Sequence, residues 1–518
     1  MKKSKLLTCG MLALALSFGA TSCSSTKIDS DVPADVVEST VEDTTEEAPA
    51  EDEAPATEEE APATEEETPA VEEEVPATEE EAPAEEEAPA EEEAPAEEEA
   101  SAEEETVTEE KDVIPAKVIE PAIVPAPEGV VNPIVNVDGM EVSSYIRTWP
   151  IGTTEEQMAE GKHWTADDVK GEYLTELIVA FAHVDQNTWG IKFPDAEPED
   201  PEATPFPELW DEVAKLQAKY PHMNMNVSVG GYGADGFSEM AADYEKRTAF
   251  IDAIVNLVLD KDLDGIDIDW EYPIGPDWGQ PISCSPDDGV NFLQLLKEMR
   301  GAFDAIKGKF GKDVSISIAA PASGWYVQKM ADVLPGIVET VDTIKLMTYD
   351  YYGSWSGQAG HAANLYTNPA DPDWGGWSTD ATVKTYLNAG VPAEKLILGL
   401  AFYGRGWDGV EPGPNGDGLY QKYEQSVFED GLSWSDMINF ANDECGFKYY
   451  WDDVAKAPYL YNEEVGGFIT FTDPRAVQEI GKYALENNLG GVMVWEYGHD
   501  YRCELFPILV ESVDTTKK

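Results

Sequence analysis

The chain has 518 residues, with 104 acidic and 33 basic side chains and a formal net charge of -71 at pH 7. This acidic balance argues against a protein that binds nucleic acid or anionic membrane surfaces, because both attract basic chains. The length suits either two to four average domains or one large barrel with additional segments. Roughly half of the net charge lies within residues 29–112, so this segment differs sharply in composition from the rest of the chain.

Residues 1–22 predict an export signal. Lysines precede an apolar stretch over residues 6–18 that is too short to span a bilayer. The segment that ends at Cys23 resembles a bacterial lipoprotein signal, in which a lipidated cysteine becomes the first mature residue. Ala20 departs from the usual pattern of such signals, and ordinary cleavage near this position is the alternative. We therefore expect an exported protein that is either secreted or held on the cell surface or outer membrane by a lipid on Cys23.

Residues 23–128 predict a linker without stable structure. They are rich in Glu, Ala and Pro, and runs such as Glu58–Ala63 recur every six or seven residues. A proline in each repeat and the scarcity of large apolar side chains exclude a coiled coil. Such a sequence cannot bury enough apolar surface to offset the entropy lost on ordering. We expect a disordered, extended stalk that lifts a folded domain off a surface, with a solubilising tail as the alternative.

The cysteines and histidines give no sign of a metal or of a disulfide framework. Beyond Cys23 the sequence has Cys284, Cys445 and Cys503, an odd and sparse set for an exported protein. A bridge between Cys445 and Cys503 is compatible with the sequence, but no spacing selects it. None of the five histidines forms a ligand pair at helical or strand spacing. We expect no metal, no other cofactor, and a monomer.

From about residue 130 the composition is that of a globular domain, in which short apolar runs alternate with amphipathic stretches. The runs predict eight strands at Glu141–Tyr145, Glu176–Phe181, Met223–Val229, Gly265–Trp270, Val314–Ala319, Thr343–Tyr349, Leu396–Phe402 and Gly491–Trp495. The stretches between them predict helices such as Glu208–Lys219, Arg247–Leu259 and Asp288–Lys307. Eight such units over residues 135–511 indicate an α/β fold, a (β/α)8 TIM barrel, with an open doubly wound sheet as the alternative. Polar residues at the C-terminal ends of several different strands favour the barrel.

The connection between the seventh and eighth predicted strands is unusually long, at roughly ninety residues. It contains two alternating stretches, Tyr449–Asp452 and Gly466–Phe471, followed by a helical segment, Asp473–Asn487. A connection of this length is rarely without structure in a compact domain. We therefore expect a small α+β insertion over about residues 404–466 on the rim of the barrel, where it would deepen a cleft into a groove.

The predicted strand Gly265–Trp270 has the most informative pattern. Asp267, Asp269 and Glu271 alternate with apolar residues, so on a strand their carboxyl groups leave the same face at steps of roughly 6.5–7 Å. Three like charges in this space cannot all stay ionised near neutral pH, so at least one proton is held and the pKa of one member rises. A structural strand gains nothing from this repulsion. We interpret the segment as an active-site strand, with a solvated polar face as the alternative.

The segment Asp264–Glu271 resembles the DGxDxDWE signature of family-18 glycoside hydrolases, the retaining chitinases. Four further segments resemble motifs at other strand ends of that family and occur in the same order: Ser228–Gly231, Met347–Gly353, Phe402–Arg405 and Gly490–Tyr497. Five motifs in one order are far more specific than any one of them. The resemblance implies a TIM barrel, with an insertion like that of the deeper-grooved members. It also implies hydrolysis, with retention, of β-1,4-linked N-acetylglucosamine in chitin or chitooligosaccharides.

The resemblance also implies roles for the acidic side chains. Glu271 would protonate the glycosidic oxygen. Because this class lacks a second carboxylate nucleophile, the 2-acetamido oxygen of the sugar would attack its own anomeric carbon and form an oxazolinium ion. Asp269 would hold the acetamido N–H and offset the developing positive charge, while Asp267 would share and then store its proton. Tyr349 would orient the acetamido oxygen.

Further positions match residues that line the sugar-binding groove in the family. Trp495 matches the tryptophan beneath the reacting sugar, and Trp355 lies where relatives have an aromatic residue on the leaving-sugar side. The remaining matches are Tyr145, Phe181, Gly231, Tyr232, Met347, Asp350, Tyr403 and Arg405. Tyr232 departs from the many relatives that have tryptophan after the glycine pair, which predicts weaker stacking there.

Two other functions remain as alternatives. One is an endo-β-N-acetylglucosaminidase that acts on glycans or peptidoglycan, although Trp270 after Asp269 favours chitin. The other is a surface lectin, since the family includes members that bind sugars after losing the acid. The presence of Glu271 together with both aspartates and Tyr349 argues against a lectin.

Overall fold

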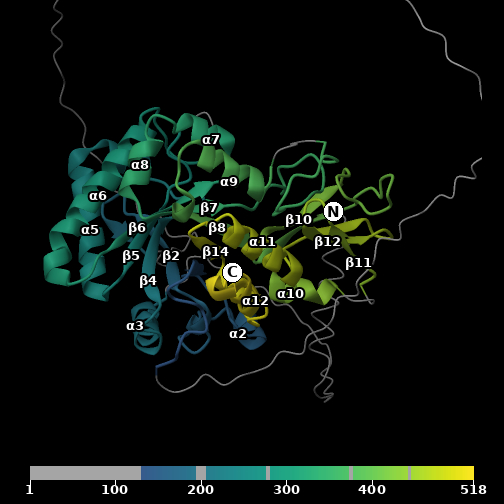
Figure 1. Ribbon diagram of the computed structural model, residues 1–518, viewed down its shortest axis with the longest axis horizontal. Helices are drawn as coiled ribbons and strands as arrows, with labels where there is room; N and C mark the ends of the chain where they lie inside the picture. Colours follow the sequence, from purple (N-terminus) through teal and green to yellow (C-terminus); the bar gives the residue numbers. More distant parts are fainter. Residues whose placement is uncertain (1–129, 194–205, 276–280, 373–376, 442–444, 518) are drawn as a thin grey trace, which may run out of the picture. The chain divides into compact units, whose positions relative to one another are not determined.

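The computed structural model describes residues 130–193, 206–275, 281–372, 377–441 and 445–517 (Figure 1). The predicted signal (1–22), the predicted linker (23–128) and the lipid attachment expected at Cys23 lie outside the described residues. In the described ranges, no helix combines the length and the apolar character needed to cross a membrane.

Eight parallel strands form a closed barrel. They are β1 (Glu141–Arg147), β2 (Glu176–Val184), β4 (Asn224–Gly230), β5 (Gly265–Asp269), β6 (Ser315–Pro321), β7 (Thr343–Met347), β8 (Leu396–Ala401) and β14 (Gly491–Trp495). The strand order is β1-β14-β8-β7-β6-β5-β4-β2, and parallel pairing of β1 with β2 closes the ring. A short strand, β3 (Ile191–Lys192), pairs with the end of β2. The closure confirms the predicted TIM barrel and excludes the open sheet.

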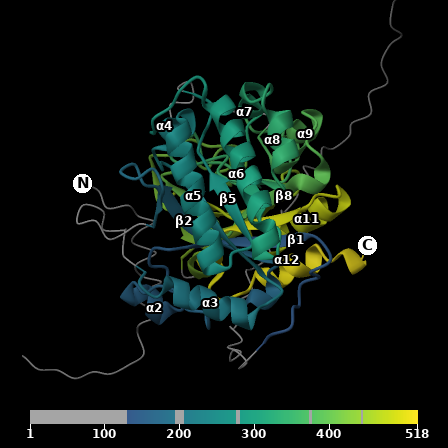
Figure 2. The same ribbon diagram turned by 90° about the vertical axis from the view of Figure 1, so that its left-hand side faces the viewer.

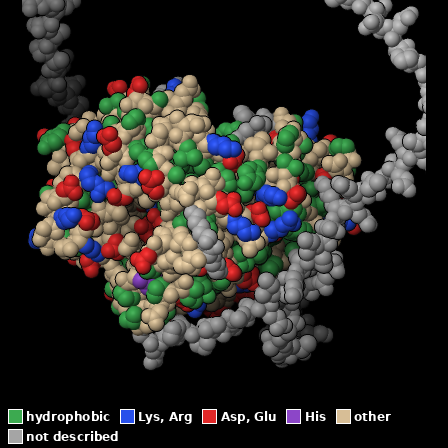
Figure 3. Space-filling view, viewed as in Figure 1, with side chains coloured by type: hydrophobic (Ala, Val, Ile, Leu, Met, Phe, Trp, Pro, Cys, Tyr) green, Lys and Arg blue, Asp and Glu red, His purple; other side chains and the backbone are tan. Residues whose placement is uncertain are grey.

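Helices surround the barrel strands (Figure 2). They are α2 (Glu155–Glu160), α3 (Leu209–Lys219), α4 (Phe237–Ala242), α5 (Tyr244–Lys261), α6 (Asp288–Phe310), α7 (Gly324–Lys329), α8 (Leu334–Thr340), α9 (Thr379–Asn388), α10 (Trp434–Met437), α11 (Pro474–Glu486) and α12 (Phe506–Ser512). On the face drawn in Figure 3, Lys and Arg side chains are interspersed with Asp and Glu.

Alternation along β5 separates the packing face of the barrel wall from its interior. Ile266 and Ile268 are fully buried in the large core between strands and helices. Just past the strand, Trp270 stacks on Phe237 of α4 with ring centroids 5.3 Å apart and meets the edge of Phe292 of α6. The aspartates that alternate with these residues therefore face the inside of the barrel.

Side-chain caps fix where several outer helices begin. Asp243 accepts two backbone N–H bonds at the start of α5, and Ser378 and Asp473 cap α9 and α11 in the same way. These oxygens satisfy backbone donors that have no partner within the helix. Pro474 follows the cap of α11, at a position where its missing N–H removes no helical hydrogen bond.

A second sheet lies between β8 and β14 in the chain and beside the barrel in space (Figure 1). Its five antiparallel strands are β9 (Tyr403–Asp408), β10 (Gln425–Ser433), β11 (Lys448–Asp452), β12 (Ala457–Asn462) and β13 (Gly467–Thr470), in the order β10-β9-β13-β12-β11. Because β9 begins two residues after β8 ends, the sheet starts at the C-terminal end of a barrel strand. This agrees with the predicted insertion at the rim.

The segment that follows β7 is attached to this sheet. Its Tyr351 and Tyr352 share a small aromatic core with residues of the sheet. His361 lies 3.1 Å from the carboxylate of Asp452 at the end of β11, and Asn368 donates a 2.6 Å hydrogen bond to the same oxygen. The insertion therefore supports the segment in which the sequence predicts Tyr349, Asp350 and Trp355 to act.

Candidate active site

The three carboxyl groups of the predicted active-site strand lie close together at the C-terminal end of β5. Asp267 is 0% exposed, Asp269 4% and Glu271 9%. The strand ends at Asp269, so Glu271 lies two residues past its end, and the peptide bond that follows Glu271 is cis. The alternation predicted for the strand therefore holds for the two aspartates, while Glu271 belongs to the loop above them.

Asp267 is enclosed by hydroxyl donors from three other barrel strands. Tyr145 of β1 and Ser228 of β4 donate to one carboxylate oxygen over 2.9 Å and 2.7 Å, and Ser317 of β6 donates to the other over 2.6 Å. Hydrogen bonds donated to a carboxylate stabilise its charged form. Both carboxylate oxygens of Asp267 therefore have hydrogen-bond partners, which hold the side chain in place inside the barrel.

Asp269 has the opposite surroundings. Burial raises its pKa well above the usual value, and the nearby charges of Glu271 and Asp267 raise it further. One of its oxygens, Oδ1, is buried and has no hydrogen-bond partner among the described residues. Asp269 is thus the aspartate whose surroundings favour the protonated form. The transfer of its proton to Asp267, which the sequence suggests, stays a prediction.

Glu271 has the protonation behaviour of a general acid. Burial raises its pKa to about 7, a hydrogen bond with Tyr272 opposes that rise, and the charge of Asp350 adds to it. A carboxyl group with this pKa keeps its proton in mildly acidic solution and can release it to a basic oxygen. Tyr272 was not among the site residues predicted from the sequence, although it follows Glu271 directly.

Tyr349 lies just beyond β7 beside Tyr403, with ring centroids 6.3 Å apart. Burial raises the pKa of Tyr349 well above its usual value, and the neighbouring Tyr403, Asp269, Asp350 and Glu271 raise it further. Its hydroxyl therefore keeps its proton near neutral pH and is a hydrogen-bond donor there.

Arg405 fixes the segment that carries Tyr349. Its guanidinium donates two hydrogen bonds to the carboxylate of Asp350, of 2.6 Å and 2.7 Å, and a third of 2.6 Å to the backbone oxygen of Glu429. Asp350 has a left-handed backbone with φ of 59°, which turns the chain directly after Tyr349. Asp350 and Arg405, both predicted to bind substrate, thus pair with each other and join the segment after β7 to β9.

Three aromatic residues form a floor at the mouth of the barrel, and we call Tyr145, Phe181 and Trp495 the aromatic floor. Phe181 stacks on Trp495 with centroids 5.5 Å apart, and Tyr145 lies 5.6 Å from the same tryptophan. Met347 packs against this cluster. Trp149, which the sequence did not single out, extends the floor by stacking on Phe181 at 6.3 Å.

The glycine pair after β4 permits a close backbone approach. Gly230 and Gly231 have φ of 132° and 98°, where other residues are strained. A Cβ on Gly230 would lie 2.0 Å from the backbone oxygen of Asp269, and one on Gly231 would lie 2.7 Å from the Phe181 ring. The N–H of Gly231 donates to that same oxygen of Asp269 over 2.9 Å. The pair thus holds β4 against the acidic strand and the aromatic floor.

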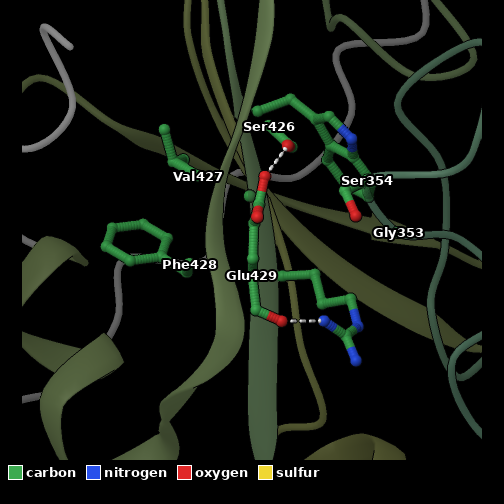
Figure 4. Close-up of a pocket in the computed structure, with 9 residues that line it drawn as sticks. Gly353, Ser354, Ser426, Val427, Phe428 and Glu429 are labelled. Atoms are coloured by element: carbon green, nitrogen blue, oxygen red, sulfur yellow. Dashed lines mark hydrogen bonds between the residues drawn. The ribbon is translucent and has the colours of Figure 1, made fainter. Parts of the chain in front are cut away.

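Two predicted sugar-binding residues are exposed. Tyr232 is 77% and Trp355 62% accessible to solvent, and Trp355 lies over the Arg405 guanidinium at 5.1 Å. Beside Trp355 is a shallow surface depression, lined by Gly353, Ser354, Arg405, Gly406, Trp407, Ser426, Val427, Phe428 and Glu429. Ser426 donates a 2.6 Å hydrogen bond to the Glu429 carboxylate on one side of it, with Gly353 and Ser354 on the other (Figure 4).

The described part of the chain contains no group of three or more His, Cys, Asp or Glu side chains arranged to hold a metal ion. In the same part, Cys284, Cys445 and Cys503 form no disulfide, so the bridge that the sequence left open between Cys445 and Cys503 is not made.

Comparisons with known proteins agree on one family. Residues 144–500 match the family model of glycosyl hydrolases family 18. The chain is 36% identical over 304 residues to Chitinase A1 of Niallia circulans, covering 56% of this chain and 42% of that protein. It is 30% identical over 353 residues to Chitinase 1 of Aphanocladium album, covering 65% of this chain and 78% of that one. The chain thus spans less than half the length of Chitinase A1.

Two solved structures give the same result. Chitinase ChiW from Paenibacillus sp. FPU-7 aligns with a TM-score of 0.64 and 34% identity over 72% of this chain and 43% of that one. A family 18 N-acetylglucosaminidase from Paenibacillus barengoltzii aligns with a TM-score of 0.60 and 32% identity, over 72% of this chain and 99% of that one. The match to the family model over residues 144–500 agrees with the barrel and with the carboxyl groups at its mouth. The chain therefore belongs to family 18 of the glycosyl hydrolases.

Proposed function

We propose that this protein is a chitinase that hydrolyses β-1,4 linkages between N-acetylglucosamine units with retention and with help from the substrate. The observation that carries the proposal is the state of the carboxyl groups around Glu271. Asp267 is held by three hydroxyls, Asp350 is paired with Arg405, and Asp269 holds a proton. None of these three is an ionised carboxylate available as a nucleophile, so the substrate has to supply one.

In the first step, the acetamido oxygen of the sugar attacks its anomeric carbon while the bond to the leaving sugar breaks. Glu271 gives its proton to the departing oxygen. A cyclic oxazolinium ion remains, and Tyr349 directs the attack by donating a hydrogen bond to the acetamido oxygen. In the second step, Glu271 takes a proton from water, which opens the ring from the face that the leaving group occupied. The two displacements restore the original anomeric configuration.

Asp269 is placed to stabilise the charged intermediate. As positive charge develops on the acetamido group, the proton of Asp269 moves to Asp267, and Asp269 becomes an anion that accepts the acetamido N–H. This electrostatic stabilisation acts in a buried site, where it is much stronger than in water. The aromatic floor packs beneath the C–H face of the reacting sugar, and Trp355 and Tyr232 offer exposed rings to neighbouring sugars.

The proposal includes location and partners. Chitin or chitooligosaccharides would be met outside the cell, after export by residues 1–22, with Cys23 as a lipid anchor and residues 23–128 as a stalk. Secretion without an anchor is the alternative. The likeness to the N-acetylglucosaminidase from Paenibacillus barengoltzii supports a second candidate, an N-acetylglucosaminidase acting on glycans or peptidoglycan. The retained acid Glu271 makes a non-catalytic lectin the weakest candidate.

The test compares two hexasaccharides with the purified full-length chain. We expect cleavage of N-acetylchitohexaose and no cleavage of cellohexaose, which has hydroxyls in place of the acetamido groups. Mass spectrometry of the products over time identifies them. Cleavage of a glycan or peptidoglycan fragment that is much faster than cleavage of N-acetylchitohexaose would favour the endo-β-N-acetylglucosaminidase. Equal cleavage of both hexasaccharides, or cleavage of neither, would contradict the proposal.

The pKa of Glu271 predicts how activity depends on pH. The first step needs Glu271 protonated, so kcat/KM, which reports the ionisation of the free enzyme, should fall as the pH rises through about 7. The measurement is kcat/KM on N-acetylchitotetraose from pH 6 to pH 9, with the thermal midpoint of unfolding recorded at each pH as the control. An activity that stays constant up to pH 9 would contradict the assignment of Glu271 as the acid.

A further inference from the structure

A buried amine lies inside the barrel, below the carboxyl groups of the active site. Lys345 is in the middle of β7, and its side chain is 1% exposed. Its ammonium lies 3.0 Å from a carboxylate oxygen of Glu176 on β2 and 3.2 Å from one of Glu141 on β1. We call these three residues the buried charge group. An ammonium in a barrel interior is costly unless it is paired, so this arrangement requires an explanation.

The buried charge group is next to the aspartate pair. On β6, Ser317 donates a hydrogen bond to Asp267, and Ala319, two residues later on the same face, pairs in register with Lys345. Lys345 therefore lies beside Ala319, which is the next inward-facing residue on β6 after Ser317, the hydrogen-bond donor to Asp267. The two side chains attract each other electrostatically, and little solvent screens them.

The polar and charged groups that interact with Asp267 come from six of the eight barrel strands. They are Tyr145 on β1, Glu176 on β2, Ser228 on β4, Asp269 on β5, Ser317 on β6 and Lys345 on β7. Lys345 is the cation in this set.

Glu176 does not cancel the charge of Lys345 in acidic solution. Burial and the charges of Glu141 and Asp267 raise its pKa to about 7, in spite of the opposing effect of Lys345. Below pH 6 Glu176 is therefore mostly neutral. The other carboxyl group beside the ammonium is that of Glu141, whose side chain is 18% exposed, so water partly screens its interaction with Lys345.

We propose that Lys345 is a positioning residue whose buried ammonium keeps Asp267 ionised, so that the single proton of the aspartate pair stays on Asp269. This inference rests on the proposed function, in which Asp269 has to pass its proton to Asp267 as the oxazolinium ion forms. If acid adds a second proton to the pair, Asp267 can no longer accept one and the step fails. Lys345 lowers the pH at which that second proton binds.

The test is the acid side of the pH profile of kcat/KM on N-acetylchitotetraose. In Lys345→Met the loss of activity on acidification should begin about one pH unit higher than in the wild type, because a nearby cation has been removed. Glu176→Gln is the matched control. This variant changes the carboxyl partner of Lys345, but that carboxyl group is already mostly neutral in acidic solution. The acid side of its pH profile should therefore coincide with that of the wild type.

Glu141→Gln provides a second variant that is independent of whether Lys345→Met folds. It removes a carboxyl group beside the Lys345 ammonium, so more of the ammonium's positive charge acts on Asp267. The acid side of its pH profile should therefore move to lower pH, opposite to the shift in Lys345→Met. If Lys345 had only a structural role, both variants would be less active at all pH values, and the acid side of the pH profile would not move. An unmoved limb in Lys345→Met, or a shift in the same direction in both variants, overturns the inference. Failure of the proposed function would show separately, as a wild type that does not cleave N-acetylchitotetraose.

Discussion

Glu271→Gln should lower kcat on N-acetylchitotetraose at least about a thousand-fold, because the amide has the shape of the acid but cannot give a proton to the leaving oxygen. The measurement is initial rate at saturating substrate, with product quantified by chromatography. Glu245→Gln, an equivalent change at an exposed position on α5, is the matched control and should keep kcat within a factor of two. The thermal midpoint of both variants should stay near that of the wild type.

The same variant separates an enzyme from a lectin. Glu271→Gln should still bind N-acetylchitotetraose, since the aromatic floor and the Asp350–Arg405 pair are unchanged, and calorimetry can measure that affinity. Retention of a tenth or more of the wild-type kcat would rule out Glu271 as the acid. A wild type that binds the oligosaccharide without cleaving it would instead support the lectin.

Asp269→Asn should lower kcat by roughly a hundred- to a thousand-fold, with a much smaller change in KM. An asparagine can still accept the acetamido N–H, but it cannot become an anion as positive charge develops on the sugar. The loss should therefore be specific to the transition state and appear in kcat. The measurement is a full Michaelis–Menten analysis on N-acetylchitotetraose at the pH optimum.

The control for this variant is Asp260→Asn, on the exposed end of α5, which should leave both constants near those of the wild type. An Asp269→Asn protein with an unchanged kcat and a raised KM would show that Asp269 only binds the substrate. That result would contradict its role in stabilising the oxazolinium ion.

The barrel could be predicted from the sequence because each of its strands is a short run of buried residues that contrasts with amphipathic helices on both sides. The ends of strands were less certain. Thr343–Tyr349 was predicted as one strand, but β7 ends at Met347, because the chain turns at Asp350 with a left-handed backbone. Glu271 likewise lies past the end of β5. Both corrections concern residues at the mouth, where the chain leaves the hydrogen-bonded ladder of the sheet.

The motifs predicted which residues gather at the mouth, and the structure brings most of them together. Ser317, Tyr272 and Trp149 were missed. Alternation on one strand shows which side chains point inward, but not which of them meet across the barrel, because that depends on the stagger between strands. Lys345 did leave a signal, a charged residue in the middle of an otherwise apolar strand, although nothing in the sequence identifies its partners.

The measurement that tests the central claim most directly is the configuration of the newly formed reducing end. Proton NMR can record the anomeric signals within the first minutes of N-acetylchitohexaose cleavage, before the two anomers interconvert. Attack by the acetamido group followed by water inverts the anomeric carbon twice, so the first product should be the β-anomer. A first product that is the α-anomer would mean a single direct attack by water, and it would contradict the account given for Asp269, Glu271 and Tyr349.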